Sequence, residues 1–317
     1  MIQIKSKDLE DSSLERIFVG TGGWSYLNKK GGDKLRAYSK LFNFVEVNST
    51  FYRIPPLSLV ETWRKRVYTN FTFTVRCHRE VTHKYGLRDY EETVKLFDKM
   101  LKICRILRAP ILHLQTPPKQ RFNRVECQYA RDLLSTFVLN DIRLAWEPRG
   151  GFTPPLMKLM KDLNIIPTVD ISRDQTPFDS DILYTRLFGK GFHTIYEFDD
   201  DELRQIEKYA LEKAYKKAFL VFHSLRMYED AHRLVVHMKS GVFPPSRRLG
   251  LEALKEIFLN IRYPITKDEL IRKEGWKIIN ISGKNVHIST ILNKLREDTY
   301  VNPEDLINEV STFFTAG

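Results

Sequence analysis

The sequence predicts a (β/α)₈ barrel followed by a small α-helical module, and three observations support this fold class. Short apolar segments recur along the chain, segments with helical periodicity separate them, and this alternation ends near Gly241. Alternating strands and helices favour a parallel sheet with right-handed crossovers, and eight such units close a barrel. An open, doubly wound sheet is the alternative, but the number of strands favours the barrel.

Eight candidate strands precede Gly241, and most are apolar runs bounded by glycine, proline or polar turn residues. The strands are expected at Ile17–Gly22, Phe44–Ser49, Phe71–Cys77, Ile111–Thr116, Leu144–Glu147, Ile166–Ile171, Leu183–Phe188 and Ala218–His223. Because few residues separate Ile166 from Leu183, we expect the sixth helix to be short or replaced by a turn.

Helical signals lie between these strands. Ser58 and Glu61 have the spacing of a capping box, which predicts a helix that continues through Val67. An apolar face with three- and four-residue steps predicts a helix containing Val94, Phe97, Leu101 and Cys104. The acidic run Asp199–Asp201 is typical of a helix N-terminus, and Leu203 begins the apolar face that follows it.

Three regions follow from this organisation: an N-terminal extension at residues 1–16, the barrel at 17–243, and a linker with a small helical domain at 244–317. The linker prediction rests on the proline-containing stretch Val242–Ser246. In the tail, helices are expected at Leu249–Asn260, after the capping box Thr266–Glu269, and at Pro303, which suits a first helical position.

The composition is that of a cytoplasmic globular protein. The chain is 42% hydrophobic and 29% charged, and no apolar run is long enough to cross a membrane. The N-terminus lacks the pattern of a secretion signal. The three cysteines, Cys77, Cys104 and Cys127, include no CxxC pair, which argues against a disulfide framework or a zinc knuckle. We expect a cytoplasmic location and no membrane partner.

The formal net charge of +11 suggests a polyanionic partner, either DNA or another phosphate-bearing ligand. After residue 243 the basic residues number 11 and the acidic residues 10, so the excess lies almost entirely in the barrel region. The alternative is that modest basicity merely keeps the protein soluble.

Polar residues are expected at the carboxyl ends of the barrel strands, where the active sites of such barrels lie. The two-residue period of a strand places one polar set on the inner face. This set contains Glu46, Asn48, Thr50, Arg76, His78, His113, Gln115, Glu147, Arg149, Thr168, Asp170, Tyr184, Arg186 and His223. Because inward charges cost several kcal/mol unless they are paired or functional, the set predicts a site; a structural ion-pair network is the alternative.

Catalytic roles are predicted for Glu46, Glu147, Asp170 and His83, which are acids and bases suited to proton transfer. Arg149 and Arg186 can clamp a phosphate or carboxylate, and the glycine-rich turn before Trp24 can present N–H groups to an anion. The predicted binding residues are Gly22, Gly23, Trp24, Asn48, Tyr52, Arg76, Gln115, Arg149, Arg186 and His223.

No cofactor is assigned. A divalent metal is an alternative, with His83, Glu147 and Asp170 as candidate ligands, although no HExxH or HxH spacing occurs. His113, alone on an apolar strand, is expected to be a core residue.

Two strings resemble the N-terminal signatures of the DUF72 (YecE-like) family: Gly20-Thr21-Gly22-Gly23-Trp24-Ser25-Tyr26 and Glu46-Val47-Asn48-Ser49-Thr50-Phe51-Tyr52. The similarity extends from about Phe18 to His237 and implies a TIM barrel with a poorly defined activity, for which a role on nucleic acid has been suggested. Gly22 stands where serine is usual in that family, and Phe222-His223-Ser224 stands where Phe-Asn-Asn is common. The tail from about Tyr263 to Val310 resembles a small helical domain of the DUF2795 type.

The leading functional hypothesis is a hydrolase acting on DNA, either a repair endonuclease or a DNA glycosylase. In the glycosylase version a flipped base stacks on Trp24 or Tyr52, and Glu46 or Glu147 activates water. One alternative is a sugar or sugar-phosphate isomerase or hydrolase, in which Arg149 and Arg186 hold the phosphate. The other alternative is a non-catalytic nucleic-acid-binding protein.

Overall fold

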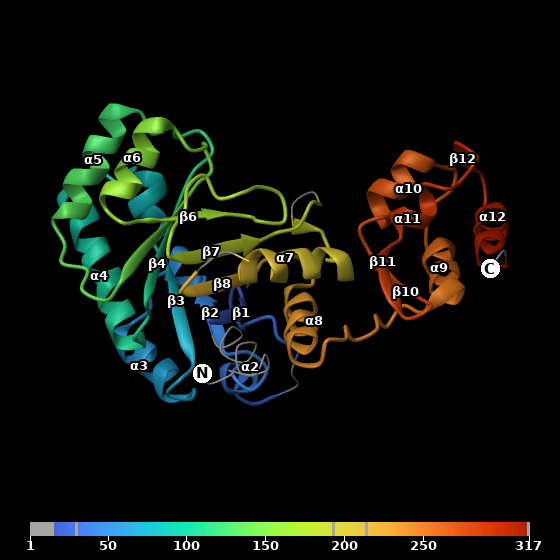
Figure 1. Ribbon diagram of the computed structural model, residues 1–317, viewed down its shortest axis with the longest axis horizontal. Coiled ribbons are helices and arrows are strands. Elements are labelled where there is room, and N and C mark those ends of the chain that lie inside the picture. Colours follow the sequence, from blue (N-terminus) through green and yellow to red (C-terminus); the bar gives the residue numbers. More distant parts are fainter. Residues whose placement is uncertain (1–15, 29–30, 192–193, 213–214, 316–317) are drawn as a thin grey trace, which may run out of the picture. The chain divides into compact units, whose positions relative to one another are not determined.

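The computed structural model describes residues 16–28, 31–191, 194–212 and 215–315 (Figure 1). The predicted N-terminal extension therefore lies outside the described residues, apart from Arg16. The chain divides into two compact units. The first holds all eight barrel strands, and the second comprises Phe188–Lys208 and Ser224–Gly317. The expected boundary at residue 243 falls inside this second unit. No helix among the described residues has the length and apolar character needed to cross a membrane.

Eight parallel strands form one sheet in the order β1-β8-β7-β6-β5-β4-β3-β2, which confirms the predicted barrel. The strands are β1 Ile17–Thr21, β2 Phe44–Val47, β3 Thr72–Arg76, β4 Ile111–Thr116, β5 Arg143–Pro148, β6 Ile166–Val169, β7 Ile182–Leu187 and β8 Lys217–Phe222. Each lies within two residues of its expected position. Nearly all of their side chains are buried, as the apolar runs predicted.

Helices alternate with the strands, and α3 to α6 cover the outer face of the sheet (Figure 1). The helices of this region are α2 Lys34–Tyr38, α3 Leu57–Lys65, α4 Glu91–Leu107, α5 Arg124–Ser135, α6 Pro154–Asp162, α7 Asp200–Glu212 and α8 Met227–Ser240, with short turns η1 Ser49–Phe51 and η2 Glu80–Lys84. No helix separates β6 from β7, as the short spacing predicted.

The start of α3 differs from the prediction. The helix follows Pro56 and begins at Leu57, so Ser58 lies inside the first turn rather than at the cap. The carbonyl of Ser58 accepts the hydroxyl hydrogen of Thr62, and no side chain caps the helix. Pro56 takes the N-cap position with an extended backbone and has no side-chain acceptor, so the predicted capping box does not form.

The barrel interior is layered along the strands. The lower layer is apolar and consists of Phe44, Ile111, Ala145, Ile166, Tyr184, Phe219 and Val221. Two residues further along the same strands, the inner face becomes polar, because a strand repeats its orientation every second residue. On β2, Phe44 is followed by Glu46; on β4, Ile111 is followed by His113. The apolar layer therefore lies directly beneath the polar residues in the barrel interior and packs against them.

Side chains close the barrel between β1 and β2, where the described strands have no backbone pairing. The Tyr38 hydroxyl accepts the Thr21 N–H and donates to the Phe44 carbonyl, both at 2.9 Å. The Asn43 side-chain oxygen accepts the Val19 N–H at 3.3 Å. These bonds take the place of the missing strand pairing.

Replacing Tyr38 by phenylalanine is expected to lower the free energy of unfolding by about 1–3 kcal/mol, because a buried N–H and a buried carbonyl lose their shared partner. Urea unfolding measures the change. Tyr26→Phe is the matched control, because Tyr26 is 84% exposed. Equal effects of the two substitutions would show that the Tyr38 hydrogen bonds between β1 and β2 do not contribute to stability.

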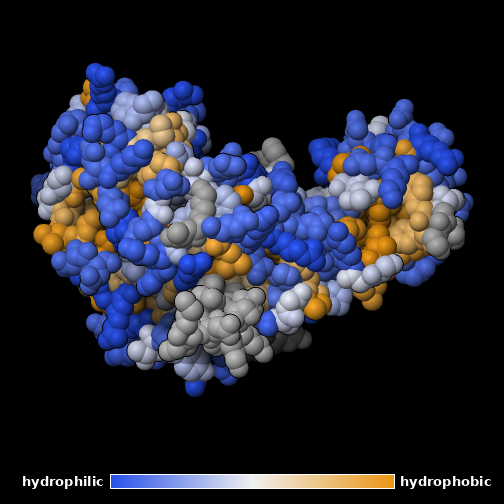
Figure 2. All heavy atoms as spheres, in the orientation of Figure 1, coloured by the Kyte–Doolittle hydropathy of each residue, from blue (hydrophilic) through white to orange (hydrophobic). Residues whose placement is uncertain are grey.

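The tail contains the three expected helices and two small antiparallel sheets that were not expected. Its elements are α9 Gly250–Leu259, β9 Ile265–Thr266, α10 Lys267–Glu274, β10 Ile278–Ile281, β11 Lys284–His287, α11 Ser289–Leu292, β12 Thr299–Tyr300 and α12 Pro303–Thr315. β10 pairs with β11, and β9 pairs with β12. The tail has its own apolar core, which includes Leu254, Ile279 and Leu306, and further apolar side chains gather on the face shown in Figure 2.

Candidate active site

Four charged or ionisable side chains meet inside the barrel at the carboxyl ends of four strands. They are Glu46 of β2, His113 of β4, Glu147 of β5 and Arg186 of β7. Each lies one inner-face position beyond a residue of the apolar layer, so the same strand period that builds this layer also points these residues inward. All four are buried, and Arg186 forms an ion pair with each of the two acids.

Glu46 is fully buried and is held by three groups. The Tyr184 hydroxyl donates to its Oε2 at 2.8 Å, Arg186 Nε lies 3.3 Å from the same oxygen, and His223 Nε2 lies 3.1 Å from Oε1. Burial alone would raise the pKa of Glu46, but Arg186 and His223 outweigh it and hold the pKa well below its usual range. Glu46 is therefore an ionised carboxylate with no exposed surface.

Glu147 lies at the edge of the cluster, with 8% of its surface exposed. Arg186 Nη1 donates to its Oε2 at 2.8 Å, and Gln115 Nε2 donates to its Oε1 at 3.1 Å. Arg149 Nε forms an ion pair with Oε1. Burial favours the neutral acid, yet Arg186 and the neighbouring His113 hold the pKa of Glu147 well below its usual range. This is the cluster's accessible carboxylate.

His113 lies between the two carboxylates, where the sequence predicted only a core residue. Its Nδ1 is 3.6 Å from Glu46 Oε2 and its Nε2 is 3.4 Å from Glu147 Oε2, and neither nitrogen has a hydrogen-bond partner among the residues that the structure describes. Burial and Arg186 lower the pKa of His113, which favours the neutral ring. A neutral imidazole carries one N–H, so one of its two nitrogens turns a lone pair toward a carboxylate.

Gly22 and His223 are coupled through the space that they share. A Cβ placed on Gly22 would lie 2.1 Å from Cε1 of His223, so the imidazole occupies the space of a side chain at position 22. In that place His223 Nε2 lies 3.1 Å from Arg186 Nε. Burial and Arg186 lower the pKa of His223 to about 4, so the ring is neutral at physiological pH.

Gly22→Ala is expected to lower the free energy of unfolding by about 1–3 kcal/mol, because the new methyl group displaces the His223 ring from Arg186 and Glu46. The double variant Gly22→Ala with His223→Ala is expected to lose less than the sum of the two single changes, as measured by urea unfolding in a double-mutant cycle. Strict additivity would contradict the coupling.

Arg76 forms a second guanidinium site beside the cluster. Its guanidinium carbon lies 3.6 Å from the centre of the Phe51 ring, its Nη1 donates to Asn48 Oδ1 at 2.6 Å, and its Nη2 donates to Gln115. Burial lowers the pKa of Arg76 to about 10, with Arg186 adding to the effect. Its buried Nε has no partner among the described residues.

Several predicted residues lie outside the cluster. Tyr52 is 63% exposed, and Trp24 packs edge-on against Trp63. His83 is exposed on the π-helical turn η2 and meets Phe51 edge-on. Asp170 accepts from Ser172 and pairs with Arg173 in the loop after β6. Gly23 lies at a positive φ of 119° in the loop after β1.

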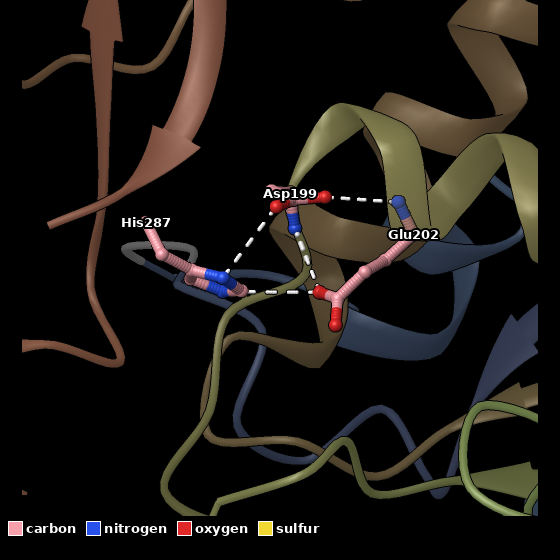
Figure 3. Close-up of side chains that lie close together, drawn as sticks. All are labelled: Asp199, Glu202 and His287. Carbon is pink, nitrogen blue, oxygen red and sulfur yellow. Dashed lines mark hydrogen bonds and ion pairs between the residues drawn. The ribbon is translucent and has the colours of Figure 1, made fainter. Parts of the chain in front are cut away.

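The candidate metal ligands His83, Glu147 and Asp170 do not come together as one group in the part of the chain that the structure describes. The described residues bring together one other group of three metal-ligating side chains, Asp199, Glu202 and His287 (Figure 3). One donor atom from each lies within 4.8 Å of the other two. No residue spacing predicts this group, because His287 comes from a strand far along the chain.

Comparisons with known proteins agree with this fold. Residues 18–249 match the profile of DUF72, a protein family of unknown function. The chain is 29% identical to the UPF0759 protein YunF of Bacillus subtilis, over 44% of this chain and 53% of YunF. It is 30% identical to YecE of Escherichia coli K12, over 26% of this chain and 30% of YecE. The matches therefore span about half or less of these relatives.

A solved DUF72 family structure from Thermotoga maritima MSB8 has the same fold, with a TM-score of 0.57 at 19% identity. The match covers 71% of this chain and 99% of that one. This match shows the shared barrel fold, and the profile match over residues 18–249 shows the family.

Proposed function

This chain belongs to the DUF72 family of proteins of unknown function, and from that premise we propose that it is a DNA-directed hydrolase, of the DNA glycosylase or repair-endonuclease kind. The observation that carries the proposal is the ionised Glu147 at the carboxyl end of β5, held between buried Arg186 and the more exposed Arg149. A buried carboxylate at that end of a barrel is placed where such enzymes perform catalysis.

Glu147 is the proposed proton acceptor, and Glu46 is a positioning residue. Glu46 has no exposed surface, whereas Glu147 reaches the edge of the cluster. A carboxylate with a strongly depressed pKa is a weak base. Arg149 can raise the basicity of Glu147 when substrate binds. Its side chain is 41% exposed and can turn from Glu147 to a substrate phosphate. Once Arg149 leaves, Glu147 loses one cation and its pKa rises toward the range useful for catalysis.

The surrounding residues support a nucleic-acid substrate. Arg76 and Arg149 offer positive charge at the strand ends, and the exposed Tyr52 ring offers a stacking surface for a base. Arg186, by contrast, is committed to Glu46 and Glu147, so the predicted pair of arginine clamps is replaced by Arg149 with Arg76.

We favour the glycosylase over the nuclease, because the candidate metal ligands that the nuclease would need do not lie together. Base excision needs a water and a carboxylate: water oxygen bonds to the anomeric carbon, the bond to the base breaks, the bonding electrons leave with the base, and a water proton passes to Glu147. The metal-dependent nuclease version relied on His83 with Glu147 and Asp170, which do not assemble. In addition, Arg186 and Arg149 already pair with the two barrel carboxylates, Glu46 and Glu147.

A panel of labelled DNAs tests the proposal: intact, abasic, uracil-, hypoxanthine- and nick-containing, each with and without EDTA. Chelator-resistant release of a base supports a glycosylase, and EDTA-sensitive strand cleavage supports a nuclease. Absence of both, together with saturable binding of small sugar phosphates and no DNA binding, would favour the sugar-phosphate alternative. DNA binding without turnover would favour a non-catalytic protein. The DUF2795 likeness of the tail stays a prediction, and we propose no separate reaction for it.

A further inference from the structure

We infer that Asp199, Glu202 and His287 form a site for one divalent transition-metal ion of the Zn²⁺ type, made from residues that the proposed reaction does not use. Asp199 and Glu202 lie at the start of α7, and His287 ends β11 (Figure 3). One donor atom from each residue lies within 4.8 Å of the others. A tetrahedral Zn²⁺ with bonds of about 2.1 Å separates its ligand atoms by about 3.4 Å, so small side-chain movements complete the geometry.

The hydrogen bonding of His287 supports a cation bound between its imidazole and Asp199. Its Nε2 lies 2.7 Å from the backbone carbonyl of Glu197, and because a carbonyl only accepts, Nε2 carries the hydrogen. In the neutral ring Nδ1 then presents a lone pair, and it lies 3.5 Å from Asp199 Oδ2. Two acceptor atoms at this separation repel each other, and a cation between them would remove the repulsion. Metal-binding histidines are typically fixed in this way, with the second ring nitrogen donating to a carbonyl or carboxylate.

The two carboxylates are oriented by separate contacts. Asp199 Oδ1 accepts the Glu202 N–H at 2.9 Å, so Oδ2 is the oxygen that faces His287. Glu202 Oε1 accepts the Tyr196 hydroxyl hydrogen at 2.6 Å and lies 3.0 Å from Lys190 Nζ. Its Oε2 accepts the Asp199 N–H and lies 3.8 Å from His287 Nε2, the ring nitrogen that donates to Glu197. Asp199 Oδ2 therefore faces the Nδ1 lone pair directly, whereas Glu202 reaches the ion only after a small side-chain movement.

Electrostatics also favours a cation. The two acids lie side by side at the start of α7, with Asp199 Oδ1 accepting the Glu202 N–H and Glu202 Oε2 accepting the Asp199 N–H. A positive ion is disfavoured at a bare helix N-terminus. Here the Asp199 side chain already caps the Glu202 N–H, so the ion would meet carboxylate oxygens rather than the free N–H groups of α7.

The donor set selects the class of ion. One imidazole nitrogen and two carboxylate oxygens suit Zn²⁺, Co²⁺, Mn²⁺ or Ni²⁺ better than Mg²⁺ or Ca²⁺, which prefer oxygen ligands. Asp199 and His287 are half-buried, so water can complete the coordination.

The test is titration of the full-length, chelator-treated protein with ZnCl₂ by calorimetry and with Co²⁺ by visible absorption. We expect one equivalent to bind, with d–d bands typical of nitrogen and oxygen ligands. His287→Ala and Asp199→Asn are each expected to weaken metal binding by more than about tenfold. Removing a residue that only orients a metal ligand already costs about tenfold or more, and these residues are the proposed ligands themselves. Asp199→Asn is informative because asparagine retains an oxygen that can cap α7, so its metal-free melting temperature is expected to match the wild type.

His232→Ala is the matched control, because this exposed histidine lies on α8 outside the three-residue group. Its affinity is expected to equal that of the wild type. The inference is overturned if the wild type takes up no metal, or if His287→Ala and Asp199→Asn bind as tightly as the control. It is also overturned if ¹⁵N spectra recorded with Zn²⁺ present show both ring nitrogens of His287 protonated at pH 7, because a proton would then be the occupant.

Discussion

Replacing Arg186 by methionine is expected to lower the free energy of unfolding by about 3–5 kcal/mol, the range found when one partner of a buried ion pair is removed. The guanidinium lies 3.3 Å from Glu46 and 2.8 Å from Glu147, and both acids are buried. Without Arg186, these two carboxylates lose their shared cation while staying out of water. Urea unfolding at pH 7 measures the loss.

The effect of this substitution should depend on pH. In the wild type both pKa values lie well below the usual range. The stability they contribute is present above the unfolded pKa of about 4.3 and is lost as the pH falls through the folded values. In Arg186→Met burial is less opposed, so the carboxyls take up protons more readily. The difference between variant and wild type is therefore expected to be smaller at pH 4 than at pH 7.

Arg186→Lys is the control for charge, because lysine retains one positive charge but not the forked geometry. Its loss of stability is expected to lie between those of the wild type and Arg186→Met. A destabilisation by methionine that is the same at pH 4 and pH 7 would show that packing, and not charge, is the role of Arg186.

Glu147→Gln is expected to reduce the proposed hydrolysis rate by about 10²–10⁴, the usual contribution of a general base. Glutamine retains the shape of the side chain but cannot accept the proton from water. Single-turnover assays on the DNA that the wild type cleaves fastest measure the change, and circular dichroism checks that the fold persists.

The exposed Glu92 on α4 provides the control, and Glu92→Gln is expected to retain the wild-type rate. If Glu147→Gln keeps full activity while binding DNA normally, Glu147 is not the proton acceptor. A loss confined to DNA binding would instead assign Glu147 the role of orienting Arg149.

Strand positions were predictable because they depend on a local pattern. Apolar runs and the two-residue period placed Glu46, Glu147 and Arg186 on one inner face, and the structure brings them into contact. The same pattern could not distinguish a core histidine from His113, because that distinction depends on which residues neighbouring strands place beside it.

Loop residues were harder to predict. His83 and Asp170 follow their strands, where the backbone turns and the two-residue period no longer applies. The β9–β12 sheet of the tail was not predicted for a related reason. Each of its strands contains two residues, which is too short for a periodic pattern. The Asp199–Glu202–His287 group joins segments more than 80 positions apart, a proximity that only the folded chain reveals.

The side-chain bridge between β1 and β2 has a consequence for self-association. These strands are the two ends of the eight-strand order, and an open strand edge is a template for pairing with another molecule. Asn43 and Tyr38 occupy the N–H groups of Val19 and Thr21 and the carbonyl of Phe44. They therefore shield groups that a foreign strand would otherwise bind. Through these two residues, the fold protects the protein against aggregation at the point where its barrel is least complete.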